Sequence, residues 1–278
     1  MRVTILGASG LLGKELMRHW LGDELVGLGS KDADLRDADR VSEAVEKSRP
    51  DWIVLSAAYT NVDGCESHPE LAFAVNRDGP VNVARVAKRI GAKLLFLSSD
   101  YVFDGKKTSP YEAEDRRDPR SVYGRSKAEA EVQLLEMLPE VCIARTSWLF
   151  GTGGKCFPDT ILKLASSRPA LDVVNDQRGD PTYAVDLAKA IIELCRKDAS
   201  GIVHVTNAGE CSWFEFAREI IRGAGLATEV RPVSSEQMTR PAPRPAYSVL
   251  SAKSLQAHGI SMPTWQDALW RYLQERKC

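Results

Sequence analysis

The sequence of 278 residues lacks the features that mark several common classes of protein. Its six cysteines include no C-x-x-C pair, so the spacing of a zinc site is missing, and a disulfide framework is not expected at this length. The formal net charge is −1 and no block of basic residues stands out, which leaves little electrostatic basis for binding nucleic acid or a membrane surface. No apolar run approaches the ~20 residues that span a bilayer, and no signal peptide precedes the apolar segment 3–6.

These absences predict a cytoplasmic protein with no bound metal, no nucleic-acid partner and no membrane partner. We expect its cysteines to be reduced and mostly buried. They are Cys65, Cys142, Cys156, Cys195, Cys211 and Cys278. The composition is that of a globular protein able to bury a sizeable core, with 44% hydrophobic and 27% charged residues.

Short apolar runs alternate with amphipathic stretches in the first half of the sequence, which is the pattern of βαβ units in a parallel sheet. We expect strands at 3–6, 25–28, 52–55, 94–97 and 141–144, and helices at 11–21, 39–48, 69–90 and 121–137. In the less regular second half we expect helices at 157–167 and 183–196, and strands at 171–174 and 202–205. Capping-box patterns at Ser212 and Thr264 mark two later helix starts, and the prolines within 240–245 exclude a helix there.

The fold class that follows is α/β, a Rossmann doubly wound parallel sheet with a smaller C-terminal substrate lobe. We expect an NAD(P)-binding Rossmann domain at residues 1–148 and a mainly substrate-binding lobe at 149–278. The two are interleaved, with segments near 179–206 returning to the Rossmann domain. A cleft between the domain and the lobe is the expected site.

A glycine-rich turn, Gly7-Ala-Ser-Gly-Leu-Leu-Gly13, directly follows the first expected strand and opens the first helix. Glycines permit backbone angles that a Cβ opposes, and they let the backbone amides approach a pyrophosphate at the helix N-terminus. The turn therefore predicts a dinucleotide site. The expected contacts there are Gly7, Ser9, Gly10, Leu11, Leu12 and Gly13.

The end of the second strand bears on the choice of cofactor. A carboxylate there binds the ribose hydroxyls of NAD, whereas a cation accommodates the extra phosphate of NADP. The sequence reads Leu28-Gly-Ser-Lys31, so Ser30 and Lys31 favour NADP. The nearby Asp32 and Asp34 keep NAD possible.

Tyr123 and Lys127 form a Y-x-x-x-K pair at the start of an expected helix, so both side chains reach the same ligand. The lysine ammonium stabilises the tyrosine phenolate, and it can hold the nicotinamide ribose. Ser99, just after the fourth strand, can donate a hydrogen bond to a carbonyl oxygen as negative charge develops on it. The three residues predict a reductase site.

Five segments together resemble the dTDP-4-dehydrorhamnose reductase family, and the likeness runs from residue 1 to the last helix. These segments are Gly7–Gly13, Ser98-Ser-Asp-Tyr-Val-Phe-Asp104, Tyr123–Lys127, Arg145-Thr-Ser-Trp-Leu-Phe-Gly151 and Asn175-Asp-Gln-Arg-Gly-Asp-Pro-Thr182. The resemblance implies NADPH-dependent reduction of the C4 ketone of dTDP-4-dehydro-L-rhamnose to dTDP-L-rhamnose.

The resemblance also implies roles for single residues. Tyr123 would donate the proton, Lys127 would hold ribose, and Ser99 would polarise the carbonyl. Further cofactor contacts would come from Asp34, Leu35, Ala57, Ala58, Tyr59 and Asn76. Substrate contacts would come from Thr60, Val62, Ser99, Asp100, Tyr101 and Trp148.

Two other interpretations stay open at this stage. The same chemistry could act on another nucleotide-linked 4-keto-sugar. Alternatively, the chain could be a non-catalytic NADP-binding subunit of the methionine adenosyltransferase beta type. Under the main interpretation the partner is a nucleotide-sugar substrate, and the protein is a monomer or a homodimer.

Overall fold

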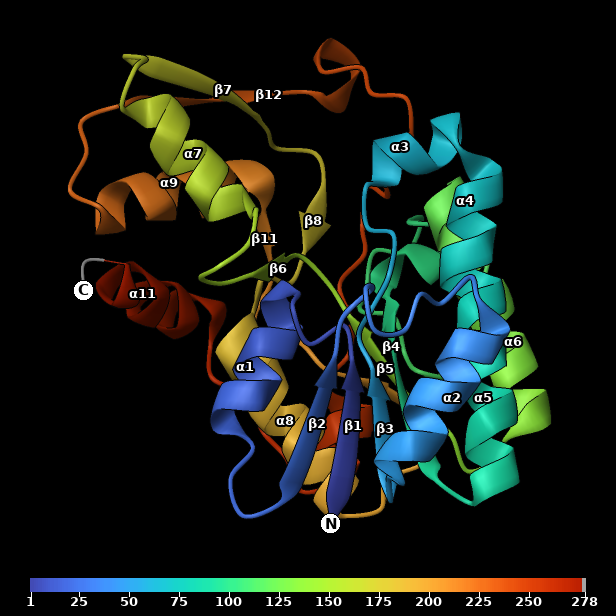
Figure 1. Ribbon diagram of the computed structural model, residues 1–278. Coiled ribbons are helices and arrows are strands. Elements are labelled where there is room, and N and C mark those ends of the chain that lie inside the picture. The colour runs from blue at the N-terminus through green and yellow to red at the C-terminus, as the bar shows by residue number, and fades with distance from the viewer. Residues whose placement is uncertain (277–278) are drawn as a thin grey trace.

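The computed structural model describes residues 1–276, and at its centre lies a six-stranded sheet in the order β10-β5-β4-β3-β1-β2 (Figure 1). The strands are β1 (Arg2–Leu6), β2 (Glu24–Leu28), β3 (Trp52–Leu55), β4 (Lys93–Ser99), β5 (Cys142–Thr146) and β10 (Gly201–His204). Every neighbouring pair in this order runs parallel. The predicted class, a doubly wound α/β fold, is confirmed.

Helices cover both faces of the sheet, which explains why its strands read as continuous apolar runs. All four residues of β3 are buried, for example. On one face lie α1 (Leu11–His19) and α8 (Ala184–Arg196), and on the other lie α2 (Ala38–Ser48), α5 (Gly79–Ile90) and α6 (Val122–Met137) (Figure 1). A separate apolar core fills each interface.

The strand order reverses at β1, which pairs with β2 on one side and with β3 on the other. At such a reversal the connections that leave the carboxyl ends of the strands diverge and leave a crevice. The glycine turn follows β1 and therefore opens onto this crevice. This edge of the sheet is where the fold provides room for a ligand.

The expected single helix at 69–90 was wrong in detail, because the segment has three parts. These are α4 (Pro69–Phe73), a π-helical turn (Ala74–Asp78) and α5, which begins at Gly79. Pro80 lacks an N–H and so removes one hydrogen bond from a regular helical ladder. Gly79 also packs against Leu35, since a Cβ at Gly79 would lie 2.7 Å from the Leu35 Cβ. The wider turn places the buried Asn76 next to the loop that follows β3.

Beyond the carboxyl edge of the sheet lies a smaller lobe with its own aromatic core (Figure 1). It contains α7 (Phe157–Ala165), α9 (Trp213–Gly223) and α11 (Trp265–Glu275), with the short strand pairs β6–β9, β7–β12 and β8–β11. The pairs are β6 (Leu149–Phe150) with β9 (Thr182–Tyr183), β7 (Ala170–Val174) with β12 (Glu229–Val233), and β8 (Arg178–Gly179) with β11 (Cys211–Ser212). Between β9 and β11 the chain returns to the main sheet as α8 and β10. The domain boundaries at 148/149 stay a prediction.

Two helices and five strands within residues 1–276 were not predicted. The helices are α3 (Val62–Ser67) and α10 (Lys253–Ala257), and the strands are β12 and the short β6, β8, β9 and β11. Pro232 lies inside β12, and a proline argues against a central strand. It is tolerated here because β12 pairs only with β7, in a two-stranded sheet. Both helix starts marked by capping-box patterns are confirmed, since the Ser212 and Thr264 side chains accept hydrogen bonds from backbone N–H groups of α9 and α11.

The five cysteines within residues 1–276 are buried, as predicted; Cys278 lies outside the described residues. No three His, Cys, Asp or Glu side chains in this described part of the chain are grouped so that they could hold a metal ion. None of its helices combines the length and the apolar character needed to cross a membrane.

Candidate active site

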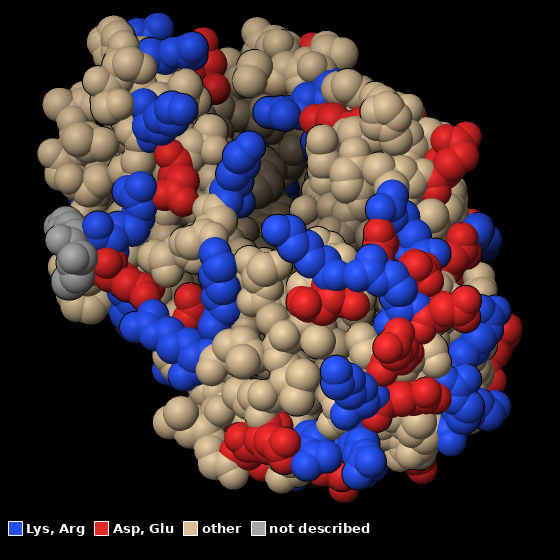
Figure 2. Space-filling view, in the orientation of Figure 1, with Lys and Arg blue, Asp and Glu red and all other residues tan. Residues whose placement is uncertain are grey.

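A cavity of about 560 Å³ lies between the carboxyl edge of the sheet and the smaller lobe. Figure 2 shows the molecule hollowed between its two parts, with Lys and Arg side chains at the rim. The residues that line the cavity come from the glycine turn, from the loops after β2, β3, β4 and β5, from α6 and from the lobe. Those predicted from the sequence are Gly7, Ser9, Gly10, Leu11, Leu12, Gly13, Ser30, Ala57, Ala58, Thr60, Val62, Ser99, Asp100, Tyr101, Tyr123, Lys127 and Trp148.

The glycine turn has the close backbone approaches that its sequence predicts. Gly7 has a φ of 97°, and a Cβ there would lie 2.6 Å from the Ala57 nitrogen. At Gly13 a Cβ would lie 2.1 Å from the Gly7 carbonyl oxygen. The first turn of α1 contains no acidic residue, so its free N–H groups face the cavity without a competing carboxylate. This turn therefore fits a dinucleotide diphosphate.

Five residues predicted to contact the cofactor are not among those that line the cavity. Lys31 is exposed and its carbonyl accepts a hydrogen bond from Arg40. The Asp34 carboxylate pairs with Arg36, whose hydrogen bonds lower the pKa of Asp34 to about 2. Leu35 is buried in the core beneath α5. Ser30, next to Lys31, does line the cavity.

The other two of these residues, Tyr59 and Asn76, tie the loop after β3 to α6. The Tyr59 N–H donates to the Asn76 side-chain oxygen at 2.8 Å, and the Asn76 amide donates to the Tyr59 carbonyl at 3.0 Å. The same amide donates to Ser126, whose hydroxyl donates to the Tyr123 carbonyl. Asn76 thus braces the start of α6, which carries Tyr123.

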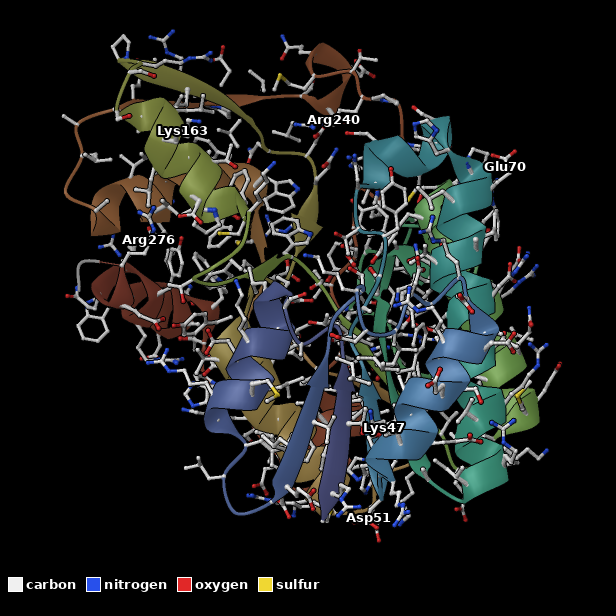
Figure 3. The ribbon with its side chains drawn as sticks, in the orientation of Figure 1. Lys47, Asp51, Glu70, Lys163, Arg240 and Arg276 are labelled. Carbon is white, nitrogen blue, oxygen red and sulfur yellow. The ribbon has the colours of Figure 1, made fainter. Side chains whose placement is uncertain are left out.

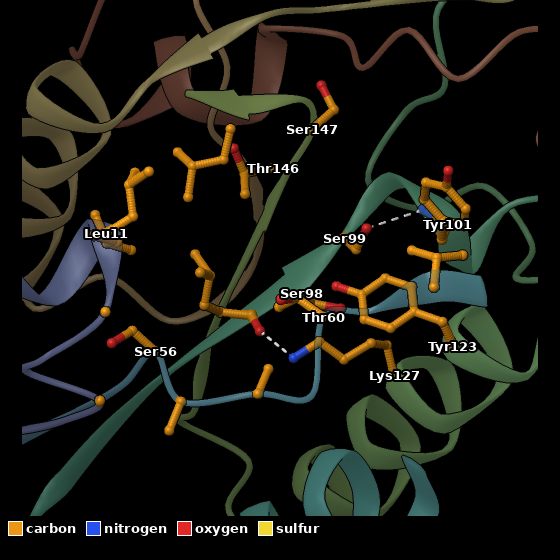
Figure 4. A pocket seen from close by; sticks show the side chains of 18 of the residues that line it. Leu11, Ser56, Thr60, Ser98, Ser99, Tyr101, Tyr123, Lys127, Thr146 and Ser147 are labelled. Atoms are coloured by element: carbon orange, nitrogen blue, oxygen red, sulfur yellow. Dashed lines mark hydrogen bonds between the residues drawn. The ribbon is translucent and has the colours of Figure 1, made fainter. Parts of the chain in front are cut away.

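The structure brings Ser99, Tyr123 and Lys127 to one end of the cavity (Figure 4). Ser121 caps α6 by accepting a hydrogen bond from the Gly124 N–H, so Tyr123 lies in the first turn and Lys127 one turn later. Burial raises the pKa of the Tyr123 phenol, and a hydrogen bond with Ser99 opposes that rise. The phenol is therefore protonated at neutral pH.

Lys127 is held deep in the site. Its ammonium donates to the Leu97 carbonyl at 2.7 Å and lies 4.3 Å from the centre of the Phe96 ring. Burial lowers the pKa of Lys127 to about 7, against a smaller opposing effect of Glu131.

Behind Lys127 lies a buried ionic network around Glu131. Its carboxylate accepts two hydrogen bonds from Arg145, at 2.9 and 2.6 Å, and one each from Arg117 and Ser98. The side chains of Glu131 and Arg145 are both fully buried. The network ties α6 to β5 and to Ser98 of β4, and so fixes the elements that carry Lys127 and Ser99.

On the substrate side, Asp100 and Trp148 have the most constrained environments. Asp100 is 2% exposed and accepts a hydrogen bond from the Ser99 hydroxyl at 2.9 Å. Burial raises the pKa of Asp100 to about 6. Trp148 has a φ of 45°, a strained value for a bulky residue, and its ring stacks on Trp213. Gly179 makes room for that ring, because a Cβ there would lie 2.6 Å from Trp148 Cε2.

Several residues that line the cavity were missed in the sequence. They are Ser56, Leu97, Ser98, Thr146, Ser147, Leu149, Lys155 and Trp213. Ser56, Ser98 and Thr146 lie at or just after the carboxyl ends of strands, so the rule that ligands bind at that edge gives a signal for them. Lys155 and Trp213 come from the lobe, and no sequence signal places them here.

A second cavity of about 680 Å³ lies in the lobe and shares Tyr101 and Trp213 with the first. Apolar side chains such as Phe157 and Ile161 line it together with Arg240 and Arg244. At its edge the Asp63 carboxylate accepts a hydrogen bond from Arg244 at 2.9 Å and lies 3.6 Å from Arg240. Figure 3 shows Arg240 between the lobe and α3, which carries Asp63.

Comparison of this chain with known proteins shows which family it belongs to. The whole chain, residues 1–278, matches the family described as RmlD substrate binding domain. The chain is 43% identical to the spore coat polysaccharide biosynthesis protein SpsK of Bacillus subtilis, over 99% of this chain and 98% of that protein. It is 39% identical to dTDP-4-dehydrorhamnose reductase of Mycobacterium tuberculosis, over 96% and 91% of the two chains.

A solved structure supports the same family. The crystal structure of dTDP-4-dehydrorhamnose reductase from Bacillus anthracis in complex with NADP superposes with a TM-score of 0.96. The two sequences are 38% identical, and the match covers 99% of each chain.

Proposed function

Because the chain belongs to the dTDP-4-dehydrorhamnose reductase family, we propose that it reduces the C4 ketone of dTDP-4-dehydro-L-rhamnose to dTDP-L-rhamnose with NADPH. The observation that carries the proposal is the convergence of Ser99, Tyr123 and Lys127 on a cavity that begins at the glycine turn. The family is one of NADP-dependent oxidoreductases. The substrate is taken from the names of relatives at about two-fifths identity over nearly the whole chain.

The cofactor would be held along the sheet edge from the glycine turn to α6. Its diphosphate would lie on the first turn of α1, beside Ser9, Leu11 and Leu12. Ser30 would face its adenosine half, and Lys127 would hold the nicotinamide ribose. Bound there, the nicotinamide supplies hydride to the carbonyl carbon.

Residues of the chain would supply the proton that the ketone oxygen, O4, takes up. Tyr123, kept protonated by burial, donates its phenolic proton to O4 as the ketone becomes an alcohol. The Ser99 hydroxyl donates its one proton to Asp100 in this structure; turned toward the same substrate oxygen, it would stabilise the developing charge. The Lys127 ammonium stabilises the phenolate that remains until solvent returns its proton.

The nucleotide-linked sugar would approach from the lobe. Its hexose would contact Thr60, Val62, Asp100, Tyr101 and Trp148, which line the first cavity. The second cavity would then lie on the path toward the nucleotide, since it adjoins the first at Tyr101 and Trp213. Arg240 and Arg244 line that cavity and carry charge opposite to that of a diphosphate. We further place the reaction in the cytoplasm, where buried, unpaired thiols are stable.

The test is a reductase assay with a matched pair of substrates. The purified protein is mixed with NADPH and either dTDP-4-dehydro-L-rhamnose or its diastereomer dTDP-4-dehydro-6-deoxy-D-glucose, and both NADPH oxidation and the sugar product are followed. We expect rapid oxidation with the first substrate and formation of dTDP-L-rhamnose. A preference for the second substrate would assign the enzyme to another 4-keto-sugar. Tight binding of NADPH without turnover of either would overturn the proposed reaction in favour of a non-catalytic subunit.

A further inference from the structure

We propose that Lys155, a residue of the smaller lobe, binds the diphosphate of the dinucleotide cofactor across the glycine turn. The inference rests on the cofactor binding proposed above and adds to it a cation supplied by the other lobe. It would make the loop between β6 and α7 part of the cofactor site.

The loop at 151–156 is fixed on the first turn of α1. A Cβ at Gly154 would lie 3.1 Å from Leu11 Cδ1, and the Lys14 ammonium donates to the Gly153 carbonyl at 2.8 Å. The Cys156 thiol donates to the Gly151 carbonyl at 3.6 Å and closes the loop at its base. The position of Lys155 next to the N-terminus of α1 is therefore set by contacts on both sides of it.

Charge in the cavity is distributed unevenly. Three charged side chains line it, namely Asp100, Lys127 and Lys155. Asp100 and Lys127 belong to the end with Ser99 and Tyr123, where Lys127 already donates to the Leu97 carbonyl. Lys155 belongs to the end with the glycine turn, where a dinucleotide would place its two diphosphate charges.

The Lys155 ammonium is free to take a ligand. Within residues 1–276 no hydrogen bond or ion pair engages it, whereas the neighbouring Lys14 is occupied by the loop backbone. The side chain is exposed at the cavity. The free N–H groups at the start of α1 favour an anion at the same place, so the lysine and the helix terminus would act on one group.

Diphosphate occurs in both proposed ligands, the dinucleotide and the nucleotide sugar. We assign Lys155 to the dinucleotide because its loop contacts Leu11 and Lys14 of α1, whereas Arg240 and Arg244 line the cavity in the lobe. The extra phosphate of NADPH is a third possible anion. Three titrations distinguish these sources: NADPH, NADH and dTDP.

The experiment measures the dissociation constants of NADPH, NADH and dTDP by calorimetry for the wild-type protein, Lys155→Met and Lys155→Arg. The matched control is Lys163→Met, which removes an exposed lysine of the same lobe that lies on α7, away from the first cavity (Figure 3). We expect Lys155→Met to weaken NADPH and NADH equally, by about tenfold, the scale of one lost charge-assisted hydrogen bond. Lys155→Arg should retain most of the affinity, and dTDP binding should not change.

Other outcomes overturn the inference in distinct ways. Unchanged affinity of Lys155→Met for both dinucleotides would remove Lys155 from the site. A loss confined to NADPH would place it on the extra phosphate, and a loss confined to dTDP would place it on the sugar nucleotide. A wild-type protein that binds neither dinucleotide would instead refute the proposed function itself.

Discussion

Trp148 and Trp213 stack face to face, with ring centroids 3.4 Å apart and ring planes 7° from parallel. Trp148 follows β5 and Trp213 opens α9, so the stack joins the edge of the sheet to the lobe. The left-handed backbone of Trp148 costs about 1–3 kcal/mol, and the stack and the space left by Gly179 hold it in place. This tryptophan wall borders both cavities, since Trp148 lines the first and Trp213 lines both, so its position should govern how the substrate is held.

Gly179→Ala tests that role. The new methyl group would lie 2.6 Å from Trp148 Cε2, so the ring must move and the stack with Trp213 must open. We expect kcat/KM for the nucleotide sugar to fall on the order of 10²-fold, because displacement of a positioning group by about 1 Å has effects of that size. The dissociation constant of NADPH should stay the same. Steady-state kinetics and a cofactor titration measure the two quantities.

The control is Gly223→Ala at the end of α9, where an added Cβ meets only the flexible tip of Leu273. Its kinetics should match those of the wild-type protein. Equal kinetics for wild-type and Gly179→Ala would show that the tryptophan wall does not hold the substrate.

Glu131→Gln tests the buried network behind Lys127. The change leaves the fully buried guanidinium of Arg145 without a counter-charge, and loss of one partner of a buried pair costs about 3–5 kcal/mol. The free energy of unfolding in urea should fall by that amount. Glu46→Gln, which breaks the exposed pair with Arg89, should change it by no more than about 1 kcal/mol. Similar losses for the two variants would mean that the buried pair does not stabilise the fold.

Lys127→Met tests the cost of burying a catalytic cation. Burial lowers the pKa of Lys127 to about 7 from 10.5. Between these values the unfolded chain binds more protons than the folded one, so wild-type stability should rise with pH across this window, by at most about 1.4 kcal/mol per unit. The variant lacks this dependence, while its turnover should fall about 100-fold or more.

The readout is the free energy of unfolding of both proteins at about pH 6.5, 8.5 and 10.5, which span the window between the two pKa values. The stability of the variant relative to the wild type should be greatest at the lowest pH and decline as the pH rises. A relative stability that does not change with pH would mean that Lys127 is not desolvated in the folded protein.

Much of the sheet and its edge follows from the sequence, because the signals are local. A fully apolar run such as Trp52–Leu55 fits a strand buried on both faces, and the glycines after β1 fit a turn of close backbone approach. The Y-x-x-x-K spacing places Tyr123 and Lys127 one helical turn apart whatever surrounds them. Local patterns of this kind predicted the end of the cavity that carries the expected chemistry.

Two residues of the site that were missed, Trp213 and Lys155, depend on contacts between distant segments. Trp213 reaches the cavity only because α9 packs in the lobe, and Lys155 only because its loop rests on Leu11 and Lys14. The break in the helix before Gly79 combines a local cause, Pro80, with the packing of Gly79 on the distant Leu35. Ser30 lines the cavity and Lys31 beside it does not, so the predicted contact of Lys31 with the cofactor stays a prediction.

Tyr123→Phe gives the most direct test of the central claim, which is that Tyr123 donates the proton to the sugar oxygen. The change removes one hydroxyl from a buried ring, so the fold and the binding of NADPH should persist. The measurement is kcat with NADPH and dTDP-4-dehydro-L-rhamnose, with the dissociation constant of NADPH as control. We predict a fall of kcat by about 10²–10⁴-fold with that constant unchanged. Wild-type turnover in Tyr123→Phe would contradict the account.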